Sequence, residues 1–188
     1  MNHATGTGRT LNIVAVAFVA LTACKNEPQF FRVKQMGDKY VVSGQGYAGS
    51  ADFPAMPKIT QVETPKLTVN NAELIANNDY VGIACFSAPS GQLDSMASHH
   101  DLFVDAMRMQ LQARGMTVKT DRPLTGNGHV FEGPSVFPQL QNQSAYTVVQ
   151  MFIARKLQKV CQLTAASVGA TLSAPAQQFI ASAVINDQ

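Results

Sequence analysis

Four side chains are of types that could bind a metal or transfer a proton: three neighbouring polar residues and one distant histidine. His99, His100 and Asp101 are consecutive, and His129 is the only other histidine after residue 24. Metal ligands on a helix need a spacing of three or four residues to share a face. Adjacent histidines at a helix start therefore point apart, and only one of them could join a distant site. We predict capping and exposed polar roles for them, with no catalytic residue, metal or cofactor.

A glycine-rich stretch is the second candidate for chemistry. Gly44-Gln-Gly46-Tyr-Ala-Gly49 matches the pattern G-x-G-x-x-G. In a dinucleotide site a helix opens at the last glycine, so that its backbone N–H groups meet the pyrophosphate. Here the chain continues to Pro54, Pro57 and Pro65, which disfavour such a helix. We therefore expect a flexible glycine loop.

The first 24 residues are typical of an export signal. Arg9 precedes a short apolar run over residues 13–20, which has the length of a signal-peptide core and is too short to span a bilayer. The run ends in Leu21-Thr22-Ala23-Cys24, which resembles the lipobox of bacterial lipoproteins. The resemblance implies that residues 1–23 are removed and that Cys24 carries a diacylglyceryl group on its thiol. An ordinary secretory cleavage before Cys24 would place the bulky Leu21 where a small residue is preferred.

Acylation of Cys24 would make a lipid bilayer the first partner of the protein. Each buried methylene of an acyl chain contributes about 0.8 kcal/mol, so two or three chains form a stable anchor. In lipoproteins of enteric bacteria, an aspartate after the lipidated cysteine retains the protein in the inner membrane. Lys25 stands at that place. The resemblance therefore implies an outer-membrane lipoprotein with its body in the periplasm.

The two remaining cysteines, Cys85 and Cys161, form an even pair in an oxidising compartment. A bond between them would close a loop of about 76 residues and contribute about 4.5 kcal/mol in the chain-entropy model. The alternative is two separate buried thiols, which behave as small apolar side chains. Neither cysteine has a second cysteine or histidine at ligand spacing, which disfavours a metal site. We favour the disulfide.

The elements that follow divide the chain into a tail and a domain. Within residues 24–66, two alternating runs around Gly37-Asp38 predict a β-hairpin over residues 30–43. Glycines and prolines from Gly44 to Pro65 predict an extended linker. Residues 67–188 are expected to form the folded domain. Its first elements are a weak strand over 67–70 and a buried strand over 80–86.

A helix is predicted from Ser98 to Arg114. Ser98 and Asp101 have the spacing of a capping box, and Gly115 follows the last turn. With a further strand at residues 116–120, the order strand, helix, strand could form a βαβ unit. Five apolar residues at helical spacing form a stripe on this helix: Leu102, Phe103, Ala106, Met109 and Ala113. Two more apolar residues, Met107 and Leu111, widen the stripe.

The C-terminal part has two further helix candidates. Apolar residues recur at helical spacing from Ser144 to Leu163, although β-branched residues leave a strand open from Tyr146 to Phe152. On the polar side of this helix, three cations would form a basic contact patch: Arg155, Lys156 and Lys159. Pro175 could begin a last helix. The expected fold is α+β: a small β-sheet with two or three packed helices and one disulfide.

Composition restricts the function more than it defines it. The chain has 188 residues, a net charge of +2 and 46% hydrophobic residues, which excludes a strongly basic nucleic-acid binder and a disordered chain. The pattern over residues 81–118 resembles a unit of accessory lipoproteins in secretion and conjugation machines. That resemblance implies a non-enzymatic subunit that acts through protein contacts in the envelope. The alternatives are a lipoprotein that binds a ligand or a cell-wall glycan and, third, a periplasmic hydrolase.

Overall fold

The computed structural model describes residues 30–44, 48–64, 67–87, 99–124, 128–154 and 159–186. The predicted signal and Cys24 lie outside these residues. Within the described ranges, no helix has both the length and the apolar character needed to cross a membrane.

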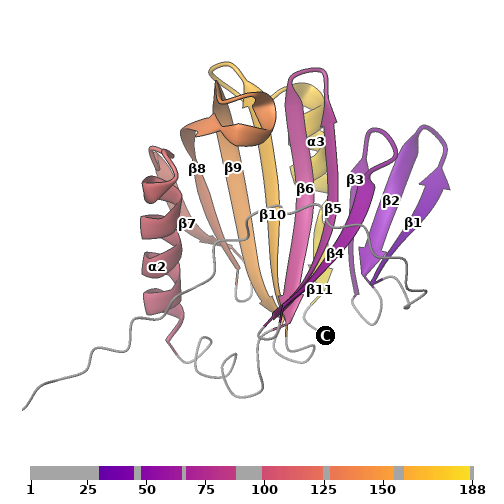
Figure 1. Cartoon of the computed structure of the whole chain (residues 1–188), viewed down its shortest axis with the longest axis horizontal. Helices are drawn as coiled ribbons and strands as arrows, with labels where there is room; N and C mark the ends of the chain where they lie inside the picture. Colours follow the sequence, from indigo (N-terminus) through magenta and orange to yellow (C-terminus); the bar gives the residue numbers. More distant parts are fainter. Residues whose placement is uncertain are drawn as a thin grey trace, which may run out of the picture.

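Two antiparallel sheets make up most of the structure (Figure 1). The smaller sheet has the strand order β1 (Phe31–Met36), β2 (Lys39–Gly44), β3 (Ala48–Phe53) and β11 (Val184–Asn186). The larger sheet has the order β4 (Lys58–Thr64), β5 (Leu67–Ala76), β6 (Asp79–Ser87), β10 (Lys159–Val168), β9 (Gln143–Ala154), β8 (Gly128–Phe137) and β7 (Thr120–Leu124). The described helices are α2 (His100–Ala113), α3 (Ala174–Ser182) and the short 3₁₀ turn η1 (Pro138–Leu140).

The expected α+β class is therefore wrong, because strands dominate the described residues and only two α-helices accompany them. The main error is the helix predicted from Ser144 to Leu163. That segment holds most of β9 and the first half of β10, which pair with each other from Lys159↔Ala154 to Val168↔Ala145. The open alternative of a strand from Tyr146 to Phe152 is the correct one.

The predicted hairpin is confirmed, but the linker after it is wrong. β1 and β2 pair from Phe31↔Gly44 to Met36↔Lys39 across the two-residue turn. The stretch from Gly44 to Pro65 contains β3 and β4, and β3 lies against β2. The side chains of Ala51 and Phe53 are fully buried. This stretch therefore belongs to the body of the protein.

The predicted βαβ unit does not form from neighbouring strands. β6, α2 and β7 follow each other in the chain, but β10, β9 and β8 lie between β6 and β7 in the sheet. The segment expected as a strand at 116–120 lies beside β8, where Thr117 and Lys119 donate backbone hydrogen bonds to Pro134 and Glu132. Their approach requires Gly133, because a Cβ there would lie 1.9 Å from the carbonyl oxygen of Thr117.

Helix α2 has the expected extent but a different buried face. It begins after His99 and ends at Ala113, with Gly115 at φ +85° beyond the last turn. Ser98, the expected cap, lies outside the described residues. Phe103 is buried as expected, whereas Leu102 and Met109 are 66% and 69% exposed. Met107 and Leu111, which were expected to widen the stripe, are buried, and so is Val104, which was not part of the predicted stripe.

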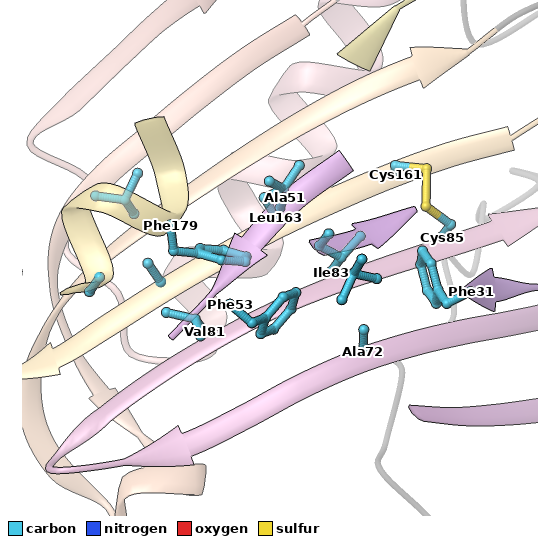
Figure 2. Packing of buried hydrophobic residues seen from close by; sticks show 14 of the residues in the cluster. Phe31, Ala51, Phe53, Ala72, Val81, Ile83, Cys85, Cys161, Leu163 and Phe179 are labelled. Atoms are coloured by element: carbon cyan, nitrogen blue, oxygen red, sulfur yellow. A yellow bond between two sulfur atoms is a disulfide. The ribbon is translucent and has the colours of Figure 1, made fainter. Parts of the chain in front are cut away.

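One face of the seven-stranded sheet is closed by the small sheet and by α3. Phe53 of β3 and Phe179 of α3 are fully buried and meet edge to face, with ring centroids 4.9 Å apart (Figure 2). The predicted last helix is confirmed as α3, in which Pro175 stands in the first turn and the Ser173 side chain accepts a hydrogen bond from the Ala176 N–H. This apolar layer continues to Phe31 and the disulfide at its other end.

Candidate binding groove

The opposite face of β5, β6 and β10 carries small and polar side chains. Side chains alternate along a strand, and residues 81, 83 and 85 of β6 face the closed core. Gly82 and Ala84 therefore face outwards. The register places Ala84 between Asn71 of β5 and Gln162 of β10, and places Thr164 opposite Gly82. These short side chains leave the surface of the sheet low at this position.

Higher walls stand on two sides of this floor. α2 packs over the neighbouring strands, where Phe103 and Leu111 join the apolar cluster that contains Phe131 and Val149. η1 follows β8 and forms a second wall with Pro138. The helix, η1 and the low strands enclose an open cleft of about 510 Å³. We call this cleft the groove.

Asn71 is the most informative polar residue of the groove. It is 3% exposed, and its side-chain oxygen Oδ1 has no hydrogen-bond partner among the described residues. A buried acceptor without a donor costs about 1–3 kcal/mol. Such a cost is typical of a position that a ligand or an ordered water completes. Asn71 therefore supplies an acceptor that a ligand N–H or O–H group could satisfy.

Four other polar side chains of the groove form hydrogen bonds in pairs. Ser135 and Thr147 share a buried hydrogen bond of 2.7 Å between their hydroxyl oxygens. Gln162 donates from Nε2 to the hydroxyl oxygen of Thr164 at 2.9 Å. Arg114 is the only charged side chain among the described residues that line the groove. The lining therefore suits a neutral ligand, or one with a single negative charge.

Tyr80 covers Gly82 at one end of the floor. A Cβ on Gly82 would lie 2.7 Å from the Tyr80 hydroxyl oxygen, so the ring can occupy this place only above a glycine. Burial raises the pKa of Tyr80, and the negative charge of Glu73 raises it further. Burial also raises the pKa of Glu73, which the charge of Lys58 partly opposes. Tyr80 is therefore a neutral phenol at physiological pH.

Two of the three candidate histidines, His100 and His129, are brought together away from the groove lining. His129, at the start of β8, contacts the Asp121 carboxylate through Nε2, and Arg108 of α2 contacts the other oxygen of the same carboxylate. The rings of His100 and His129 are neighbours, with centroids 6.2 Å apart. Burial acts to raise the pKa of Asp121, but the hydrogen bonds from Arg108 and His129 outweigh it and the pKa is lowered.

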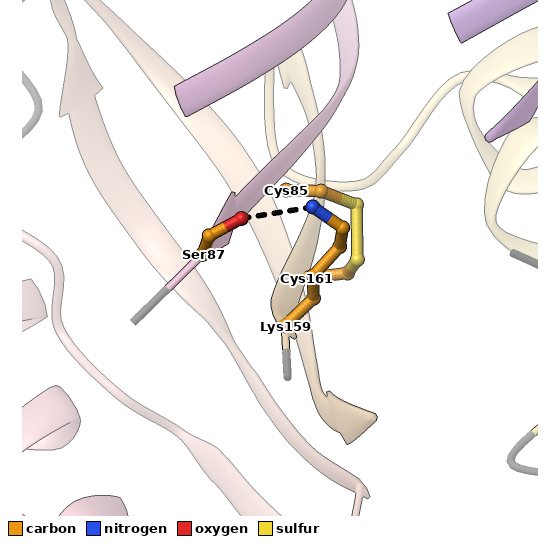
Figure 3. Close-up of a disulfide and its surroundings, with 4 residues drawn as sticks. All are labelled: Cys85, Ser87, Lys159 and Cys161. Carbon is orange, nitrogen blue, oxygen red and sulfur yellow. Dashed lines mark hydrogen bonds between the residues drawn. A yellow bond between two sulfur atoms is a disulfide. The ribbon is translucent and has the colours of Figure 1, made fainter. Parts of the chain in front are cut away.

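The predicted disulfide is confirmed. Cys85 and Cys161 are direct partners on β6 and β10, with Cα atoms 4.1 Å apart, and both are fully buried (Figure 3). Cys24, by contrast, remains a prediction, because it lies outside the described residues.

Lys159, one of the three residues of the predicted basic patch, lies on a strand and not on the predicted helix. Lys159 lies in β10, where its amine donates to the Ser87 hydroxyl at 2.8 Å (Figure 3). The same amine lies 4.5 Å from the centre of the Phe30 ring. Burial lowers the pKa of this lysine. Arg155 and Lys156 lie outside the described residues. Lys159 therefore covers apolar surface at the end of the sheet and lies on a strand, where a helix was predicted.

Two glycines of the G-x-G-x-x-G motif lie in strands, where a flexible loop was expected. Gly44 ends β2, Gly49 lies in β3, and the chain continues as a strand to Phe53. Residues 45–47 lie outside the described part of the chain. The stretch after the last glycine therefore pairs in the small sheet, where the dinucleotide pattern would need a helix.

Sequence reasoning missed the groove residues. The signal that could have indicated them is weak: Asn70 and Asn71 interrupt an otherwise strand-like run, and Gly82 interrupts the next one. Polar residues inside a buried strand need hydrogen-bond partners. They indicate a ligand site only when the structure shows which of those partners the protein itself supplies. No protein-family model, curated protein or solved structure matches the chain.

Proposed function

We propose that the protein is a non-enzymatic outer-membrane lipoprotein whose groove binds a short glycan with N-acetylated sugars, as found in bacterial cell walls. Cys24 would anchor the body to the bilayer and leave the groove open to the periplasm. The observation that carries the proposal is the buried, unpaired oxygen of Asn71 inside a concave cleft.

The chemistry of the lining supports this ligand class. An N-acetyl sugar offers an amide N–H that could donate to Asn71, and hydroxyl groups for Gln162, Gln110 and Gln139, which also line the groove. The apolar part of the lining suits the C–H faces and acetyl methyl groups of such a sugar. A pocket with mostly apolar walls and a few placed polar groups is the usual form of a small-molecule site.

Titration of the purified protein with N-acetylglucosamine oligomers tests the proposal. We expect saturable binding by calorimetry and shifts of the Asn71 side-chain amide in nuclear magnetic resonance spectra. Asn71→Leu removes the acceptor and keeps the branched shape of the side chain, and we expect it to weaken binding about tenfold or more, the 1.4 kcal/mol equivalent of a lost buried hydrogen bond.

A matched control lies on the same strand. Thr68 lies four residues before the core-facing Ala72 on β5, so the two side chains are on the same face of the sheet. Thr68→Val therefore changes the face opposite to Asn71 and should leave the affinity unchanged. Glucose oligomers without acetyl groups should bind more weakly than the N-acetylated ones. A folded protein that binds neither series, or an Asn71→Leu variant with unchanged affinity, would refute the glycan assignment.

A second candidate is the accessory subunit of an envelope machine, and the open edge of β4 favours it. β4 is the last strand of its sheet and pairs only with β5 among the described strands. Such an edge can accept an extended segment of a partner protein by strand addition. A photo-cross-linking residue at Gln61, compared with one at Gln177 on α3, would trap that partner in cells.

A further inference from the structure

We propose that His100 and His129 bind one divalent first-row transition-metal ion between the start of α2 and the start of β8. The two rings are neighbours in space, 6.2 Å apart at their centroids and inclined at 51°. They come from elements 29 positions apart along the chain, so the fold assembles the pair. The proposal is independent of the glycan groove, to whose described lining neither histidine belongs.

His129 is prepared as a metal ligand by its hydrogen bond to Asp121. Its Nε2 contacts the carboxylate, and an ionised carboxylate can only accept, so Nε2 carries the proton. When the ring is in its metal-binding form, with this one proton, its lone pair is on Nδ1. His129 is 8% exposed, and Nδ1 has no hydrogen-bond partner among the described residues. A basic nitrogen is thus buried with its lone pair unused.

His100 supplies a second buried nitrogen. Its Nε2 atom is buried and also has no partner within the described part of the chain. Its other nitrogen, Nδ1, lies 4.0 Å from the Asp101 carboxylate. Three buried side-chain atoms of the described residues lack a partner, and two of them belong to this pair of rings. One ion between the rings would satisfy both nitrogens at once.

The separation of the rings fits a shared ion. A zinc–nitrogen bond is about 2.0–2.1 Å, so the centre of a ligating imidazole lies about 3.2 Å from the metal. Two such rings lie about 5.2 Å apart at the tetrahedral angle of zinc and about 6.4 Å apart when the two nitrogens lie opposite each other. The observed 6.2 Å lies between these values, so tetrahedral zinc would draw the two rings about 1 Å closer.

The surroundings of His129 match the support that metal-binding histidines usually have. Such a histidine donates its second N–H to a carboxylate, which fixes the ring and raises its basicity. Asp121 occupies this place and is itself held by Arg108, which also contacts Asp105 on α2. The carboxylate is therefore held from both sides.

The ligands select the class of ion. Imidazole suits zinc, copper and nickel, whereas magnesium and calcium prefer oxygen ligands. No group of three or more metal-binding side chains occurs among the described residues. Two imidazoles would thus hold the ion and water would complete its shell. The ion would link α2, one wall of the groove, to the sheet.

Metal titration of the untagged protein, purified from its host and stripped with a chelator, tests the site. We expect one Zn²⁺ to bind per chain by calorimetry, with no binding of Mg²⁺. With Cu²⁺, electron paramagnetic resonance should show two coordinated nitrogens. His100→Gln should leave one nitrogen and lower the Zn²⁺ affinity by more than about tenfold, and Asp121→Asn should lower it by about 10–100-fold.

His99→Gln is the matched control, because it alters the neighbouring histidine and should leave the affinity and the nitrogen count unchanged. If His129→Gln fails to fold, His100→Gln carries the test, since the His100 side chain is 29% exposed. Equal affinities of wild type and His100→Gln would overturn the proposal. So would an equal loss in His99→Gln, or a wild type that binds no Zn²⁺ at 100-fold molar excess.

Discussion

The two faces of the seven-stranded sheet are built from the same strands but are covered differently. On one face, β3, α3 and the disulfide close a continuous apolar layer around Phe53 and Phe179. On the other, α2 covers the side of β8 and β9, while the small residues of β5, β6 and β10 remain open as the groove. The closed face stabilises the fold, and the half-covered face keeps polar groups without partners.

Residues that stabilise the fold and residues that could recognise a ligand therefore lie largely on different faces of this sheet. Mutations on the closed face should reduce the free energy of unfolding strongly and leave ligand affinity little changed until the protein unfolds. Mutations of the polar groove residues on the other face should do the reverse, whereas the apolar residues that hold α2 on that face also contribute to stability. The following predictions test that division.

The largest effect is expected from removing the disulfide of the closed face. The double variant Cys85→Ala and Cys161→Ala should lose about 4.5 kcal/mol of unfolding free energy, because the bond closes a loop of 76 residues. Urea unfolding, followed by circular dichroism, measures this loss. A wild-type midpoint that stays constant when reductant is added would contradict the prediction.

Phe53→Ala should destabilise the protein by about 4 kcal/mol, since it opens a cavity in a fully packed layer and removes the edge-to-face contact with Phe179. The same unfolding measurement applies. A loss below about 1 kcal/mol would mean that the small sheet contributes little to the closed face.

Phe103→Ala, on the half-covered face, should cost about 3 kcal/mol, at the lower end of the usual range because the residue lines an open cleft. Leu102→Ala is its control on the same helix and should change stability by less than about 0.5 kcal/mol, because Leu102 is exposed. Equal effects of the two changes would mean that α2 packs on the sheet with a different face, rotated about the helix axis.

Asn71→Leu is expected to act in the opposite direction. It removes a buried oxygen without a partner, so the unfolding free energy should rise by about 1 kcal/mol while the ligand affinity falls. Thermal unfolding and ligand titration of one preparation would measure both. A variant that loses stability and keeps its affinity would assign Asn71 to the core.

The smallest effect is expected from acid. The folded pKa of Asp121 lies below its ordinary value of 3.8, so its stabilising contribution is complete above that pH and is lost as the pH falls through the lower folded pKa. Asp121→Asn should therefore flatten the decline of stability below about pH 4, by about 1 kcal/mol or less for a partly exposed pair. Identical pH profiles of the two proteins would contradict this.

Much of the fold near the turns and helix ends could be predicted from the sequence. Gly37-Asp38, Gly115 and Pro175 are local signals, and the elements they bound occur where expected. The disulfide followed from the even pair of cysteines. Signals that act over a few residues survive in the final structure because few long-range contacts oppose them.

The errors arose where a strand is buried on both faces. In β9, Val148 faces the closed layer while Val149 faces α2, so apolar residues occur without alternation and also satisfy a helical spacing. In α2, apolar residues surround the helix, and periodicity alone could not distinguish Leu102 from Val104. The groove and the pairing of His100 with His129 depend on strand order, which no local pattern encodes.

Strand order also has a consequence for how the chain acquires its structure during synthesis. β6 is an interior strand of the large sheet, yet its neighbour β10 follows it by more than 70 residues. Until β10 has been made, one edge of β6 has no strand to pair with, and contacts between such distant segments form slowly. An unpaired apolar edge invites association with other chains. A chaperone that holds the N-terminal half until the last third emerges would therefore raise the yield of folded protein.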